Sequence, residues 1–111
     1  MAMTPEGKVK HAVKKLLKSY DDQVWYFIPV SAGYGVHGVP DIIACVCGQF
    51  VAIECKATAK QKPTQRQQFV LSSIAQAGGS ALVINIDNVD FLKRVIDGVL
   101  KDAGWVTPKP K

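Results

Sequence analysis

The sequence predicts a single α/β domain in which helices flank a mixed central sheet, with the elements in the order α-β-β-β-α-β-α. Three observations support this fold class. The chain has 111 residues, which suits one domain. Hydrophobic residues make up 48% of it and charged residues 21%, so a core can be buried within an ordinary polar surface. Helix-like and strand-like hydrophobic patterns alternate along the chain without a repeat or a linker.

The first predicted element is a helix that begins after Thr4. Thr4 is a suitable N-cap, and Pro5 occupies the first helical position, where its missing N–H costs nothing. Apolar residues recur at helical spacing as far as Tyr20, and Asp21-Asp22 ends the helix. Much of the remaining surface of this helix is lysine: Lys8, Lys10, Lys14, Lys15 and Lys18. We expect a mostly solvated face, from which one or two lysines reach phosphates.

Three strands are predicted to follow. Residues 24–30, V-W-Y-F-I-P-V, are aromatic and branched, as strands prefer. Residues 31–38 form a loop with three glycines, which permit close backbone approach. Residues 40–47 and 49–56 form the next two strands, and Gly48 between them predicts a tight hairpin.

The rest of the chain supplies the last three elements. Residues 57–63 are a polar, basic loop, and a helix runs from near Thr64 to about residue 77, where Gly78-Gly79 stops it. A strand over residues 81–86 and a helix over residues 88–100 complete the fold. We assign residues 1–103 to one domain and residues 104–111 to a flexible tail.

Composition narrows the function classes. The net charge of +5 and the pI of about 9.2 favour an anionic partner, with nucleic acid first and a membrane surface second. No signal peptide or membrane-spanning apolar run is visible, so we expect a cytoplasmic protein without a membrane role. The cysteines, Cys45, Cys47 and Cys55, lack zinc-site spacing and are expected to be buried free thiols.

The hairpin places two carboxylates opposite each other. If Cys47 and Gly48 are the turn residues, Asp41 faces Glu54, with Cβ atoms about 4.5–5.5 Å apart. Such a pair repels unless a cation lies between the two groups or they share a proton. A register slip of one residue would move Asp41 to the other face of the sheet.

Lys56 completes a charged cluster on the hairpin. It lies two residues beyond Glu54 and therefore points from the same face of the strand, whereas Val51, Ile53 and Cys55 point from the other face, into the core. Opposed carboxylates suit Mg²⁺ or Mn²⁺, which would polarise a phosphate and activate water. A neighbouring lysine can position that water or neutralise charge on the phosphate. This set of groups predicts phosphodiester hydrolysis.

These motifs resemble a nuclease family. P40-D41 with E54-C55-K56 resembles the PD-(D/E)XK superfamily, in its E-x-K form. The VRR-Nuc branch is suggested by T4-P5-E6-G7, by G-Y-G-V-H-G-V-P-D, and by I-E-C-K followed by P63-T64-Q65-R66-Q67. The resemblance runs from about Thr4 to Gly79, with its motifs in order on the expected elements. It implies a restriction-endonuclease-like core and a stand-alone protein of phage or bacterial type.

The resemblance also implies a metal site. Asp41 and Glu54 would be ligands, the backbone carbonyl of Cys55 would join them, and Glu6 would be a further acidic ligand, directly or through water. Glu6 has a structural alternative, since an acidic residue in the first helical turn is favourable against the helix dipole. We do not assign His37 to catalysis, because a lone histidine in such a loop is more often a surface residue or a phosphate contact.

Further roles follow from the resemblance. Lys56 would be the catalytic lysine, and Gln67 would support catalysis by contacting Lys56, water or phosphate. Gln67 also has a structural alternative as part of a capping box with Thr64. Ser31 and Tyr34, in the glycine-containing loop, are expected to contact the DNA backbone.

The predicted function is metal-dependent DNA endonuclease activity. No base-reading module is recognisable, so we expect selection of DNA structure rather than sequence, with the four-way (Holliday) junction as best substrate. Because resolving a junction needs a cut in each of two strands, we expect a homodimer. Apolar side chains at residues 25–27 and along the last helix could supply its interface.

Two other function classes are considered. One is a non-catalytic nucleic-acid-binding domain with a nuclease fold, against which the intact Asp41, Glu54 and Lys56 argue. The other is a thiol redox protein that uses Cys45 and Cys47. These cysteines lack the helix N-terminus that activates reactive pairs. A cleavage assay with and without Mg²⁺ separates the three classes.

Overall fold

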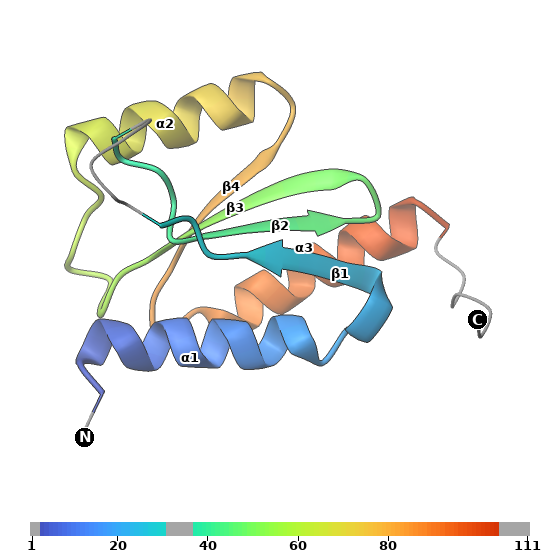
Figure 1. Ribbon diagram of the computed structural model, residues 1–111, viewed down its shortest axis with the longest axis horizontal. Coiled ribbons are helices and arrows are strands. Elements are labelled where there is room, and N and C mark those ends of the chain that lie inside the picture. Colours follow the sequence, from blue (N-terminus) through green and yellow to red (C-terminus); the bar gives the residue numbers. More distant parts are fainter. Residues whose placement is uncertain (1–2, 31–36, 105–111) are drawn as a thin grey trace.

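A four-stranded mixed sheet forms the centre of the protein (Figure 1). The computed structural model describes residues 3–30 and 37–104. β1 (Val24–Phe27), β2 (Ile42–Val46) and β3 (Gln49–Cys55) form an antiparallel meander, and β4 (Ser80–Ile84) lies parallel to β3 at the edge. The predicted α/β class with a mixed sheet is therefore confirmed.

Three α-helices pack on this sheet: α1 (Pro5–Lys18), α2 (Gln65–Gln76) and α3 (Val89–Asp102). The element order differs from the predicted one by a short 3₁₀ helix, η1 (Asp21–Gln23), between α1 and β1. In this turn the Gln23 N–H donates to the Tyr20 carbonyl at 3.1 Å, and Asp21 has a positive φ of 51°. None of the helices in the described ranges has both the length and the apolar character needed to cross a membrane.

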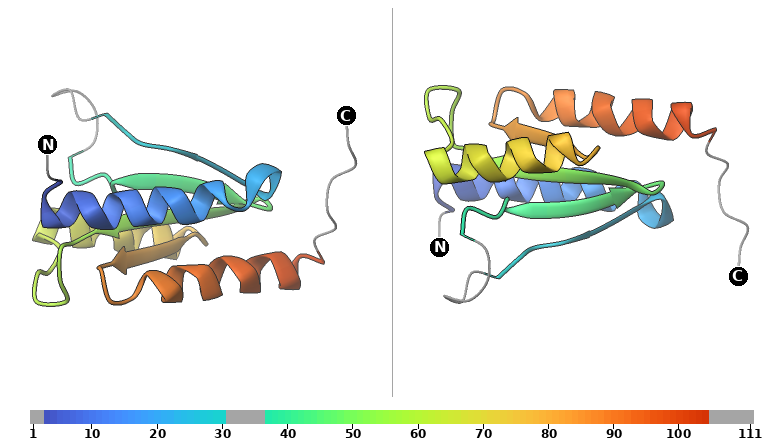
Figure 2. Two further views of the ribbon diagram at one scale, coloured as in Figure 1. Left: turned by 90° about the horizontal axis from the view of Figure 1, so that it is seen from below. Right: turned by 90° about the horizontal axis from the view of Figure 1, so that it is seen from above.

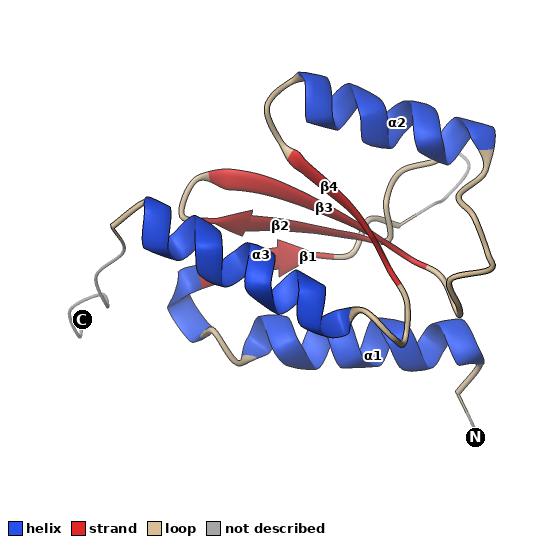
Figure 3. Ribbon diagram, turned by 180° about the vertical axis from the view of Figure 1, so that it is seen from behind, coloured by secondary structure: helices blue, strands red, loops and turns tan. Residues whose placement is uncertain are grey.

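The helices cover the two faces of the sheet unequally. α1 and α3 lie side by side on one face (Figures 2 and 3), where Tyr20 at the end of α1 donates to Asp97 of α3 at 2.6 Å. Their apolar residues join the sheet in the main core: Val9, Val13, Leu17, Val24, Ile42, Ala44, Val46, Val51, Ile53, Cys55, Ile84, Leu92, Ile96 and Leu100. α2 covers the opposite face with a smaller cluster formed by Ile43, Ala52 and Leu71.

All four strands are shorter than predicted, and β1 and β4 lose residues at their C-terminal ends for reasons visible in the structure. β1 ends at Phe27 instead of continuing to residue 30, since Pro29 has no N–H for the ladder. β4 ends at Ile84 instead of residue 86. There the side chain of Asn88 accepts from the Asn85 N–H at 2.6 Å and turns the chain into α3.

One region of the sheet stays uncovered. Trp25, Cys45 and Phe50 are register partners across β1, β2 and β3, and all three are exposed. The prediction that all three cysteines are buried is therefore wrong. Cys55 is buried in the core, and Cys47 is half-buried in the hairpin turn. Cys45 is exposed on the part of the sheet that α2 does not cover.

The last helix belongs to the core rather than to a spare surface. Leu92 and Ile96 are fully buried, and Leu100 is nearly so, whereas Phe91 is 41% exposed. Most of the apolar stripe that the sequence offered for dimerisation is thus used inside the domain. The exposed apolar side chains of β1 remain available for self-association, with Trp25 at 66% exposure and Phe27 at 45%.

Candidate active site

The hairpin register is the predicted one. β2 and β3 pair from Val46 with Gln49 to Ile42 with Ile53, so Asp41 and Glu54 are the next residues outward. Both stand at the end of the sheet where β2 begins and β3 ends. The N-terminal turns of α1 and α2 lie at this same end (Figure 1). Side chains from both helical layers can therefore reach the two carboxylates.

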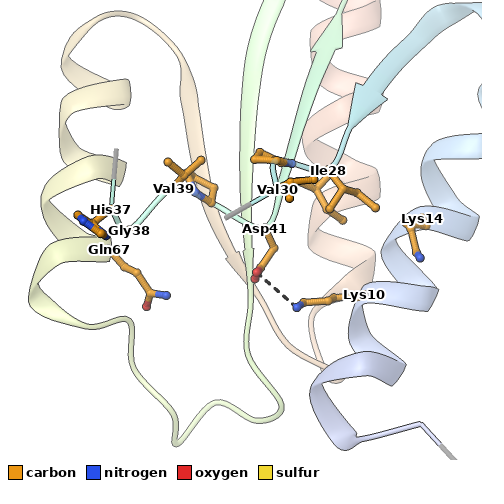
Figure 4. A pocket seen from close by; sticks show the side chains of 12 residues that line it. Lys10, Lys14, Ile28, Val30, His37, Gly38, Val39, Asp41 and Gln67 are labelled. Atoms are coloured by element: carbon orange, nitrogen blue, oxygen red, sulfur yellow. Dashed lines mark ion pairs between the residues drawn. The ribbon is translucent and has the colours of Figure 1, made fainter. Parts of the chain in front are cut away.

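Asp41 is held from two directions. Its Oδ2 accepts the backbone N–H of Cys55 at 2.8 Å, and its Oδ1 lies 3.5 Å from the ammonium of Lys10 (Figure 4). Lys10 Nζ also lies 3.6 Å from Oε2 of Glu6, one helical turn earlier. Burial acts to lower the pKa of Lys10, but Asp41 and Glu6 more than reverse this effect and raise it. Lys10 therefore joins Glu6 to Asp41, a contact that the sequence did not single out.

Glu54 is enclosed by groups from β3 and α2. Only 2% of it is exposed. Its Oε2 accepts from Nε2 of Gln67 at 3.2 Å and lies 3.5 Å from Nζ of Lys56. Lys56 Nζ in turn donates to Oε1 of Gln67 at 3.0 Å. The amide of Gln67 thus contacts both the carboxylate and the lysine.

Gln67 also caps α2. The Thr64 hydroxyl accepts the Gln67 N–H at 3.1 Å, and Oε1 of Gln67 accepts the Thr64 N–H at 2.9 Å. The predicted capping box is therefore present. The same Oε1 accepts from Lys56. The cap fixes the rotamer that brings Gln67 into the site, so the structural contact and the contact with Lys56 coexist in one side chain.

The charge balance of the site is unfavourable for two ionised carboxylates. Burial and the adjacent Asp41 raise the pKa of Glu54 to about 7, and Lys56 offsets this only in part. The Cys55 thiol points into the core, where burial and Asp41 raise its pKa to about 12. Glu54 is therefore a buried acid whose ionisation calls for an additional positive charge nearby.

The donor set suits a hard cation. Asp41 and Glu54 offer carboxylate oxygens. The Cys55 N–H points toward Asp41, while the Lys56 N–H points the other way, to the Ile84 carbonyl at 2.9 Å. Because the N–H and C=O of one strand residue point to the same edge, the Cys55 carbonyl also lies on the Asp41 side. Among the described residues no three His, Cys, Asp or Glu side chains already form a metal cluster, and Glu6 is paired with Lys10.

The end of the glycine-containing loop is clamped to α2. Arg66 Nε donates to the His37 carbonyl at 3.2 Å. Gly38 has a φ of +77°, and a Cβ there would meet Cγ of Arg66 at 2.8 Å. Only glycine fits this contact, which seats the loop beside Gln67. The predicted DNA contacts Ser31 and Tyr34 lie outside the described residues.

A pocket of about 410 Å³ opens beside Asp41, between α1 and the two ends of this loop (Figure 4). Its lining is Lys10, Lys14, Ile28, Pro29, Val30, His37, Gly38, Val39, Pro40, Asp41, Ile42 and Gln67. Lys10 reaches Asp41 from α1, and Gln67 projects from α2 on the far side. The pocket therefore combines an acidic centre with basic groups on the α1 wall.

No family model, curated protein or solved structure matches this chain. The resemblance to the PD-(D/E)XK superfamily and its VRR-Nuc branch therefore stays a prediction from the motifs.

Proposed function

We propose that this chain is a metal-dependent DNA endonuclease of the PD-(D/E)XK type. One observation carries the proposal. Asp41 and Glu54 oppose each other at the end of the sheet, Glu54 is buried with a pKa raised to about 7, and Lys56 stands beside it. Opposed acids destabilise a hairpin unless a cation or a shared proton compensates them. A metal ion bound by Asp41 and Glu54 would compensate this repulsion and could bind a phosphate.

Each group has a role in the proposed site. Asp41, Glu54 and the Cys55 carbonyl would hold Mg²⁺ or Mn²⁺. Glu6 would contribute only after leaving Lys10. When bound, the ion polarises the phosphate and lowers the pKa of the attacking water.

The chain's own groups supply orientation and charge. Lys56 Nζ holds the attacking water or neutralises charge that develops on the phosphate. Gln67 fixes Lys56 and Glu54 through its two amide atoms. The Cys55 N–H holds Asp41 in place. These three fixed contacts provide the preorganisation that phosphoryl transfer needs.

The proposed substrate is DNA, with the four-way junction as the best candidate and a homodimer as the active form. The basic α1 wall of the pocket favours a polyanion. The uncovered apolar row of Trp25, Cys45 and Phe50 favours self-association through the sheet face near β1.

A second candidate function is non-catalytic nucleic-acid binding. One contact favours it, since Lys10 Nζ already neutralises part of the charge on Asp41 without any metal. In this case Lys10 would be a permanent counter-ion and the acids would be structural.

A cleavage assay separates the two candidates. Four-way junctions and plain duplexes are incubated with Mg²⁺, Mn²⁺, Ca²⁺ or excess EDTA. We expect cleavage with Mg²⁺ or Mn²⁺, none with EDTA, and binding with little turnover in Ca²⁺, which prefers more ligands at longer distances. Glu54→Gln and Lys56→Ala should abolish cleavage, whereas Lys101→Ala, an exposed change on α3, should not. Undiminished cleavage in EDTA or by Lys56→Ala would exclude the proposed mechanism.

A further inference from the structure

A row of lysines leads away from the site along α1. Lys10, Lys14 and Lys18 are four residues apart and therefore share one face of the helix. Lys10 and Lys14 line the pocket beside Asp41. A second hollow of about 300 Å³ lies further along α1 and is lined by His11, Lys14, Lys15 and Lys18. Lys14 lines both, so a continuous basic surface connects the site to the far end of the helix.

Two of the three lysine charges in this row are not used in ion pairs within the described residues. Lys10 pairs with Glu6 and Asp41, but Lys14 and Lys18 have no ion-pair partner in the part of the chain that the structure describes. Glu6 is the one acidic residue within α1. The buried residues of α1 are apolar, so Lys14 and Lys18 are free to serve binding.

We infer that the lysine row of α1, defined by Lys10, Lys14 and Lys18, binds the phosphate backbone of the DNA strand that enters the site. This inference rests on the proposed nuclease function. At 1.5 Å per residue the row is about 12 Å long, which matches roughly three to four phosphates of one duplex strand. Lysine acts there as a point charge for phosphate and reads no base. The row therefore sets the path of the backbone without adding sequence specificity.

DNA fits this surface better than an anionic membrane does. A helix that lies in a membrane interface inserts apolar side chains beside its basic ones. In α1 the apolar side chains Val9, Val13 and Leu17 are fully buried against the sheet and α3. The row also begins at the acidic site, where a phosphodiester would have to lie for hydrolysis.

The test is the salt dependence of DNA binding. Affinity for a fluorescent duplex is measured in Ca²⁺ between about 50 and 200 mM KCl, where phosphate contacts dominate. The wild-type chain is compared with Lys14→Ala/Lys18→Ala. Lys10 is kept, because it contacts Asp41. The matched control is Arg94→Ala/Lys101→Ala, which removes the same charge from exposed positions on α3.

We expect the α1 double variant to lower the slope of log affinity against log salt by about 1.8 and to weaken binding at least ~10-fold near 0.1 M KCl. The α3 double variant should change the slope little. Equal losses in the two variants would show that only net charge matters and would overturn the inference. Unchanged DNA affinity in the α1 variant would overturn the inference as well. Binding to anionic phosphatidylglycerol vesicles is measured in parallel, and an α1 variant that loses affinity only for the vesicles would also overturn it.

Cleavage in Mg²⁺ distinguishes this inference from the function beneath it. If the wild-type chain cuts DNA, Glu54→Gln does not, and the α1 variant binds like the control, then the lysine row is excluded and the nuclease assignment stands. If the expected slopes are found but the wild-type chain never cuts, the lysine row stands as a DNA-binding surface. The nuclease assignment then falls.

Discussion

The carboxylate of Asp41 accepts the backbone N–H of Cys55 at 2.8 Å, just beyond the last paired residues of β2 and β3. This hydrogen bond gives the two opposed acids different environments. Asp41 satisfies a backbone donor and also pairs with Lys10, whereas Glu54 is a buried acid whose surroundings raise its pKa to about 7. From register alone, removing either acid should relieve repulsion. The contacts predict instead that removing Glu54 and removing Asp41 change the stability of the protein in opposite directions.

Without metal, Glu54→Gln should raise the melting temperature and Asp41→Ala should lower it. Glutamine keeps the size and an acceptor oxygen for Gln67 while removing the charge that repels Asp41. Alanine at position 41 leaves the Cys55 N–H without its acceptor, at a cost of about 1–3 kcal/mol. Thermal unfolding in EDTA at pH 8 measures both, with the exposed Asp102→Asn as a charge control. Equal destabilisation by both site variants would show that the repulsion is unimportant.

Stability of the metal-free protein should depend on pH through Glu54. Its pKa rises from 4.5 to about 7 on folding, so the folded state binds more protons than the unfolded state in this window. The Glu54 contribution to the free energy of unfolding is therefore fully present below pH 4.5 and is lost as the pH rises to about 7.

Urea unfolding of the wild-type chain and of Glu54→Gln between these pH values isolates this contribution. Glu54→Gln has no group that titrates at position 54, and subtraction removes the effects of the other groups. The difference in unfolding free energy should change by up to about 3 kcal/mol across the window. A difference that stays constant with pH would mean that the Glu54 pKa is not raised by folding.

The double contact of Gln67 can be separated by a pair of variants. Thr64→Ala and Gln67→Ala both remove the capping box, and each should destabilise the protein by about 1 kcal/mol. Only Gln67→Ala also removes the contacts to Lys56 and Glu54. We expect the cleavage rate to fall about tenfold or more in Gln67→Ala, an amount that corresponds to at least about 1.4 kcal/mol. Thr64→Ala should keep most of the activity at a temperature where it is folded. Similar rates for both variants would leave Gln67 with a capping role alone.

The sequence was sufficient to predict the hairpin, because Gly48 marks the turn and a two-residue turn of Cys47 and Gly48 sets the register. With φ at +50° for Cys47 and +84° for Gly48, both turn residues are in the left-handed conformation that two-residue hairpins use. The register then placed Asp41 opposite Glu54, and strand alternation placed Lys56 beside Glu54. The capping box was visible from Thr64 and Gln67 for the same reason: such patterns are local in sequence.

Contacts between distant segments could not be read in this way. Lys10 looks like one lysine among five on an exposed helix, and only the packing of α1 at the end of β2 brings it to Asp41. Burial of Cys45 was predicted wrongly because strand alternation does not say whether a helix covers a given face. Trp25 is exposed for the same reason, since α2 covers β3 and β4 but leaves the β1 side open.

Replacing Gly38 by alanine should destabilise the protein more than the same change at Gly48. Gly38→Ala places a Cβ 2.8 Å from Cγ of Arg66 and also forces alanine into a positive φ of +77°. Gly48→Ala is the matched control, because its φ of +84° is similarly strained but nothing lies within 4 Å of the added Cβ. The strain alone costs roughly 1–2 kcal/mol. Chemical denaturation should show a larger loss for Gly38→Ala, together with weaker DNA binding. Equal losses would mean that the loop yields without leaving Arg66.

The dimer prediction now points to the face near β1 rather than to α3. β1 is an edge strand, and its Trp25 and Phe27 stand on one face with ring centroids 5.6 Å apart. Phe50 extends this apolar surface across the sheet. Trp25→Ser/Phe50→Ser should convert a dimer to the 12.0 kDa monomer, as measured by light scattering, with little loss of stability because both side chains are exposed. Phe91→Ser, the matched change on α3, should leave the dimer intact. Because one chain has one site, the monomer should nick four-way junctions instead of cutting both strands in one binding event. A wild-type chain that is monomeric on and off DNA, and cuts duplex as readily as junctions, would exclude the dimer and leave the nuclease proposal in place.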